Sequence, residues 1–140
     1  MFEILKKYET NGSFLFNRED RLNQKCNAPN NKSGVYLFYD NESNELIYIG
    51  RSGKLNNDGT MFVRQGGIKK RIVNGKQFGQ PRRKSLPLKM EEEGIKTLKI
   101  CWFITHSSNY TDCPSIIKCK LLNEYEAKTG NLPRWNNQGC

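Results

Sequence analysis

Apolar and aromatic residues are concentrated in three short runs of the chain, at residues 34–39, 46–50 and 98–105. The runs are rich in β-branched and aromatic side chains, which favour strands. A polar segment joins the first two runs, and this pattern predicts an antiparallel hairpin. Alternation gives the first strand two faces, one with Val35, Leu37 and Tyr39 and the other with Tyr36 and Phe38.

Two further stretches have the signals of helices. Ile68 and Ile72 are four residues apart and a glycine follows, which predicts a short helix with a glycine stop. Pro114 suits the first turn of a second helix over residues 115–128, which another glycine ends. The chain is therefore predicted to have an α/β (α+β) fold, with a small central antiparallel sheet of about three strands flanked by helices.

The regions outside these elements are polar. Residues 1–32 are too short and too polar to bury a core of their own, so we expect an N-terminal arm. Within it, Phe14-Leu15-Phe16 fits either a short strand or an anchor on the core. Residues 77–89 contain two prolines and three consecutive cations, which predicts a basic loop. The main domain is expected to span residues 33–140.

Composition limits the class of protein. The chain has 140 residues, of which 36% are hydrophobic, and no apolar run approaches the roughly 20 residues that cross a membrane. We therefore expect a cytoplasmic protein with no membrane partner. Its five cysteines are irregularly placed, without a Cys-x-x-Cys pair, and it has a single histidine. These features argue against a zinc site and against a disulfide framework.

The charge balance points to a polyanion as partner. Lysine and arginine exceed aspartate and glutamate by 23 − 14 = 9, and residues 59–90 contain no acidic residue. Such clustering is typical of nucleic-acid binding, although a basic surface that is merely solvated has the same composition. The candidate contacts to nucleic acid are Arg51, Arg64, Lys69, Lys70, Arg82, Arg83 and Lys84.

Three short motifs occur in a fixed order. Gly34-Val35-Tyr36 lies on the first strand, Tyr48-Ile49-Gly50 on the second and Pro133-Arg134-Trp135-Asn136 near the end of the chain. With the hairpin, basic helix, strand and helix that carry them, these motifs resemble the GIY-YIG nuclease family over residues 33–137.

The resemblance implies a metal-dependent DNA endonuclease that hydrolyses phosphodiester bonds with one Mg²⁺ or Mn²⁺ ion. Glu124 would bind the metal ion, Arg71 would stabilise the phosphate and Asn136 would support the site. Tyr36 would activate or position the attacking water and Tyr48 would orient it, but the sequence leaves open which tyrosine is the base. A phenol is a poor base at neutral pH unless nearby cations lower its pKa.

Two glutamates compete for the role of metal ligand. The spacing of twelve residues that the family implies pairs Glu124 with Asn136. Ile117, Leu121 and Glu124 also share one face of the predicted helix, whereas Glu126 lies on another. We therefore expect Glu124 to be the ligand.

The chain departs from the family pattern between the hairpin and the basic helix. Tyr48 and Arg71 are 23 residues apart, which indicates an insertion at about residues 52–65, and Arg51 or Arg64 could share the role of the arginine. A role in restriction, mobile-element cleavage or repair stays open, and cutting both strands would need a homodimer or sequential nicking. The alternative is a non-catalytic nucleic-acid-binding module on the same fold. An RNA-binding role rests on charge alone.

Overall fold

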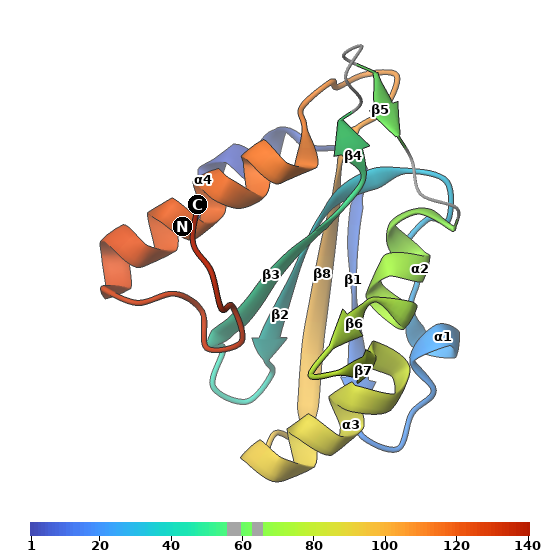
Figure 1. Ribbon diagram of the computed structural model, residues 1–140, viewed down its shortest axis with the longest axis vertical. Helices are drawn as coiled ribbons and strands as arrows, with labels where there is room; N and C mark the ends of the chain where they lie inside the picture. The colour runs from blue at the N-terminus through green and yellow to red at the C-terminus, as the bar shows by residue number, and fades with distance from the viewer. Residues whose placement is uncertain (56–59, 63–65) are drawn as a thin grey trace.

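The computed structural model describes residues 1–55, 60–62 and 66–140, and in this part of the chain a four-stranded antiparallel sheet forms the centre (Figure 1). The predicted α+β class is confirmed. Across the sheet the strands follow the order β1 (Asn11–Asn17), β8 (Thr97–His106), β2 (Ser33–Asp40) and β3 (Leu46–Ser52).

Helices cover both faces of the sheet (Figure 1). The 3₁₀ helix η1 (Glu3–Lys7) and α4 (Pro114–Thr129) pack on one face. The other face is covered by α1 (Leu22–Lys25), α2 (Gly67–Asn74) and α3 (Arg82–Glu93). Within the described residues, none of these helices combines the length and the apolar character needed to cross a membrane.

Short two-stranded ribbons extend from this framework. One ribbon follows β3 and precedes α2, and the other joins α2 to α3 (Figure 1). Their strands are β4 (Lys54–Leu55) with β5 (Met61–Phe62), and β6 (Lys76–Gln77) with β7 (Gln80–Pro81).

The central strand β2 is buried on both of its faces, and its side chains alternate between the faces as predicted. Val35 and Leu37 pack with Ile117 and Leu121 of α4. On the opposite face, Tyr36 and Phe38 contribute to a second cluster with residues of α2 and α3. The hydrophobic effect therefore fixes the register of β2, because a shift by one residue would exchange the two sets of side chains.

The N-terminal segment belongs to the sheet and is not a separate arm. Residues 11–17 pair with β8 along their whole length, and Phe16 is fully buried. Phe2, Leu5 and Tyr8 belong to the cluster beneath α4. The short strand predicted as one alternative for Phe14-Leu15-Phe16 is confirmed as part of β1, an edge strand with polar or exposed residues at most positions.

The predicted basic loop over residues 77–89 is largely helix α3. Arg82, Leu86 and Met90 are spaced by four residues and are all buried, with Gly94 ending the helix in a left-handed conformation. The sequence did not reveal this four-residue spacing of buried positions, because a buried arginine is rare and the internal Pro87 removes a backbone hydrogen bond of the helix.

A disulfide bond joins Cys119 in α4 to Cys140 at the C-terminus. The C-terminus lies against α4 in Figure 1. The two cysteines are 21 residues apart, so their proximity depends on the path of the tail after α4. Cysteine spacing alone did not indicate this bond.

The place of β1 in the core gives a stability prediction. Phe16→Ala removes a fully buried ring and should lower the free energy of unfolding by about 3–5 kcal/mol. The neighbouring Leu15 is 47% exposed, so Leu15→Ala should change it by less than about 1 kcal/mol. Urea unfolding of both variants measures the difference, and equal small effects would contradict a structural role for β1.

Candidate functional site

The hairpin brings the two signature tyrosines to the same face of the sheet. Tyr36 of β2 lies directly opposite Gly50 of β3, and Phe38 lies opposite Tyr48. A Cβ atom at position 50 would overlap the Tyr36 ring and lie 2.7 Å from its hydroxyl oxygen. Glycine is therefore required for the Tyr36 ring to lie across β3. The ring centroids of Tyr36 and Tyr48 are 6.3 Å apart.

A small pocket of about 90 Å³ opens at these tyrosines. Its described lining consists of Tyr36, Tyr48, Arg51, Arg71 and Lys118, which come from β2, β3, α2 and α4. The volume is roughly that of three water molecules in the liquid. Elements that are distant in the sequence therefore converge on a space suited to a small polar group. We call it the tyrosine pocket.

The tyrosine pocket is strongly positive. Arg51, Arg71 and Lys118 contribute cations, and no carboxylate is part of the described lining. None of the three takes part in an ion pair with another described residue. Arg51 donates a hydrogen bond to the backbone oxygen of Gly53 at 2.8 Å. Like charges held this close, without a counter-ion, favour the binding of an anion.

The pKa of Lys118 reflects this environment. Burial lowers the pKa of its amine, and the positive charges of Arg51, Arg71 and Arg82 lower it further. An anion in the pocket would oppose this shift and stabilise the protonated amine. As the pH is raised, Lys118 should therefore lose its proton at a lower pH than an ordinary lysine does. The affinity of the pocket for an anion should fall over that lower pH range.

Tyr48 is not activated as a base. Burial raises the pKa of its phenol, and the neighbouring Tyr36 raises it further, whereas Arg82 and Arg71 act in the opposite direction. Its hydroxyl is therefore protonated at neutral pH and can donate a hydrogen bond. Base catalysis would need a lowered pKa, and at Tyr48 the raising effect of burial and of Tyr36 outweighs the lowering effect of the two arginines.

Arg82 lies beneath the site and not on the surface, although its sequence predicted a contact with nucleic acid. It is 1% exposed. Its guanidinium donates to the Arg71 backbone oxygen at 2.7 Å and to Gln77 Oε1 at 2.8 Å. A longer bond of 3.3 Å reaches the Tyr48 hydroxyl. The guanidinium carbon is 5.1–5.6 Å from the ring centroids of Tyr36, Phe38 and Tyr48.

Glu124, the expected metal ligand, does not line the tyrosine pocket. Its Oε2 accepts a 2.6 Å hydrogen bond from the backbone nitrogen of Phe2 and lies 3.8 Å from Lys128 Nζ. Lys118 is the α4 residue in the pocket. Six residues on a helix correspond to about 9 Å along the axis and about 120° around it, so the side chains of Lys118 and Glu124 lie on different faces and different turns of α4. Glu126 is exposed.

Asn136 acts as a link between the tail and the sheet. Its Oδ1 accepts from the Ile49 nitrogen at 2.9 Å, and its Nδ2 donates to the Ile49 oxygen at 3.0 Å. The backbone nitrogen of Trp135 donates to the oxygen of Ile47 at 2.8 Å. Asn136 therefore holds the tail beside Tyr48, but both ends of its amide are already in use.

The remaining predicted contacts lie outside the tyrosine pocket. Lys70, Arg83 and Lys84 are exposed and Lys69 is half-buried. Arg83 donates a 2.7 Å hydrogen bond to Asn74 Oδ1. Arg64 lies outside the described residues, as do residues 56–59, 63 and 65 of the predicted insertion.

The residues of the tyrosine pocket do not fit the expected divalent metal ion. Mg²⁺ and Mn²⁺ bind to carboxylate and other oxygen ligands. The described lining offers two phenols and three cations, which would repel a divalent ion. Among the described residues, no three His, Cys, Asp or Glu side chains are grouped so that they could hold a metal ion.

Sequence reasoning missed Lys118 as a member of the site. Lys118 lies three and four residues before the buried Leu121 and Leu122. A lysine beside the apolar stripe of a helix is half-buried more often than one on the opposite face, and this position was the available signal.

Comparison with other proteins gives no assignment, because no protein-family model, curated protein or solved structure matches this chain. The resemblance to the GIY-YIG nucleases therefore stays a prediction from the motifs and their order.

The two adjacent arginines at the start of α3 provide a test of the site's support. Arg82→Ala removes a fully buried side chain with three hydrogen bonds, two of them to the side chains of Gln77 and Tyr48, so it should lower the free energy of unfolding by at least about 3 kcal/mol. Arg83→Ala, at an exposed position, should change it by less than about 1 kcal/mol. Thermal and urea unfolding give the comparison. Equal effects would show that Arg82 is not the buried support described above.

Proposed function

We propose that this protein binds the phosphodiester backbone of nucleic acid and that the tyrosine pocket receives one phosphate group without a divalent metal ion. The observation that carries this proposal is the convergence of Arg51, Arg71 and Lys118 on a small space whose described lining has no carboxylate. A phosphate matches this site in charge, in size and in its number of hydrogen-bond acceptors.

Each side chain of the pocket would make a different contact with the phosphate. Arg71 and Arg51 present planar guanidinium groups, which can donate two hydrogen bonds to one phosphate. Lys118 supplies a compact positive charge from the side of α4. Tyr48, whose raised pKa keeps its hydroxyl protonated, can donate a further hydrogen bond. These contacts recognise the backbone and carry no sequence information.

The exposed cations extend the positive surface beyond the pocket. Lys70, Arg83 and Lys84 are all exposed, and the chain carries a net charge of +9. Contacts of this kind add affinity that depends on salt concentration and not on base sequence. They favour DNA or RNA over a small phosphate compound as the physiological partner.

Phosphodiester hydrolysis, as in an endonuclease, is the second candidate. It is favoured by the meeting of Tyr36, Tyr48 and Arg71 in one pocket, in line with the GIY-YIG resemblance. In such a reaction Arg71 would stabilise charge on the phosphate and the tyrosines would position the attacking water. Lys118, kept protonated by the phosphate, would add positive charge beside it.

Binding to DNA in the presence of EDTA tests the leading proposal. Arg71→Gln and Lys118→Gln should each weaken binding to a labelled duplex by about tenfold, because each removes a charged hydrogen-bond donor to phosphate. Lys120→Gln is the matched control, since Lys120 is exposed on the same helix and should change the affinity less than twofold. Fluorescence anisotropy gives the affinities. A requirement for Mg²⁺, or equal effects of Lys118→Gln and Lys120→Gln, would contradict the proposal.

Incubation with supercoiled plasmid separates binding from hydrolysis. For a binding module, we expect no nicked product with Mg²⁺, with Mn²⁺ or with EDTA. Nicking in EDTA that is abolished by Tyr36→Phe would establish the second candidate. Nicking that needs a metal ion and is lost in Glu124→Ala, but not in Glu126→Ala, would instead restore the metal site predicted from the sequence.

A further inference from the structure

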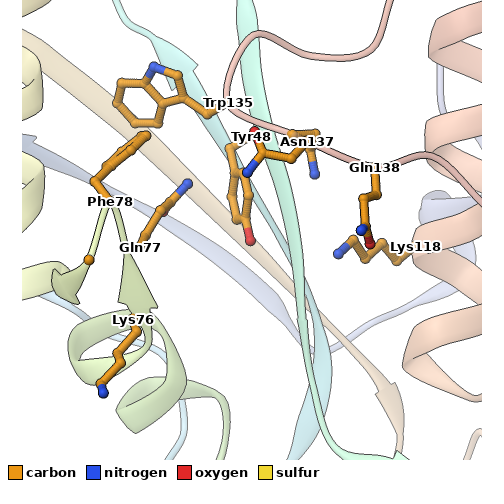
Figure 2. A pocket seen from close by; sticks show the side chains of 10 residues that line it. Tyr48, Lys76, Gln77, Phe78, Lys118, Trp135, Asn137 and Gln138 are labelled. Carbon is orange, nitrogen blue, oxygen red and sulfur yellow. The ribbon is translucent and has the colours of Figure 1, made fainter.

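A larger pocket, of about 580 Å³, adjoins the tyrosine pocket. The two pockets share Tyr48 and Lys118 in their walls. Figure 2 shows Phe78 and Trp135 at one end of the larger pocket, Lys118 and Gln138 at the other and Tyr48 between them. Its volume is within the range of roughly 300–1,000 Å³ that is typical of sites for small organic groups.

An exposed aromatic ring stands at one end of this pocket. Phe78 occupies the tip of the β6–β7 ribbon with a φ of 56° and is 44% exposed. Its ring contacts the buried Trp135 edge-on, with centroids 5.3 Å apart, and Lys89 Nζ lies 5.0 Å from its centroid. Phe78 and Gly79 form the two-residue loop between β6 and β7, and a hairpin loop of this length commonly has positive φ at both of its residues.

Amide groups line the space between the ends of the pocket. Gln77 accepts a hydrogen bond from Arg82 through Oε1, which leaves its buried Nε2 without a partner among the described residues. Figure 2 shows this nitrogen directed toward the space between Trp135 and Tyr48. Asn137 and Gln138 add two exposed amides from the tail. Amide groups can both donate to and accept from the edge of a nucleobase.

We propose that the larger pocket binds an unpaired nucleobase of the strand whose phosphate occupies the tyrosine pocket. The Phe78 ring contacts the base, and the exposed amides of Asn137 and Gln138 contact the polar edge of the base. The base and the phosphate are then neighbours in one strand, because Tyr48 and Lys118 border both pockets. This inference rests on the proposed function and narrows its substrate class to single-stranded or locally unpaired nucleic acid.

Two labelled DNA probes test this inference, a short single strand and a blunt duplex that contains the same strand. Phe78→Ala should weaken binding of the single strand by about tenfold, which is the effect of losing one base–aromatic contact. Binding of the duplex should change less than twofold, because its bases are paired and only its phosphates are contacted. Phe78→Tyr retains an aromatic ring and should keep the affinity for the single strand within about twofold.

Leu88→Ala is the control for loss of an exposed apolar side chain, since Leu88 is 61% exposed on α3. It should leave both affinities unchanged. If wild-type protein binds the duplex but Phe78→Ala leaves single-strand binding intact, or weakens both probes equally, the base pocket is refuted and the phosphate site stands. If wild-type protein binds neither probe, the proposed function fails and the inference fails with it.

Discussion

The buried guanidinium of Arg82 holds together the parts of this molecule that build the site. It bonds to the last turns of α2 through the Arg71 backbone oxygen, to the β6–β7 ribbon through Gln77 and to β3 through Tyr48. It also lies close to three aromatic rings of the central hairpin, which stabilise a cation. Because one planar group satisfies three separate elements, the positions of Tyr48, Arg71 and Gln77 depend on each other.

The same arrangement concentrates positive charge at a pocket whose described lining contains no acidic residue. Burial lowers the pKa of the Lys118 amine, and the positive charges of Arg51, Arg71 and Arg82 lower it further. Such repulsion reduces the stability of the empty protein, and a bound polyanion would recover it through mass action.

Much of the fold follows from local pattern. The run of aromatic and branched residues in β2 reflects burial on both faces of the strand, and the four-residue spacing in α2 reflects burial of one helix face, so the sequence predicts both elements directly. By contrast, α3 escaped prediction because Arg82 occupies a core position that pattern rules reserve for apolar residues. Tyr36, Tyr48 and Arg71 meet as the motifs predicted. Glu124 lies outside this pocket, because a spacing along the chain does not determine which turn of a helix reaches a pocket formed by other elements.

The tail after α4 has a second consequence for the molecule. β3 is the last strand of the sheet, and an uncovered edge strand offers free backbone groups to other chains. Trp135 and Asn136 occupy backbone groups of Ile47 and Ile49 on that edge. The closing segment thus protects the sheet from pairing with a second molecule, and a chain shortened before Trp135 would be prone to aggregate through β3.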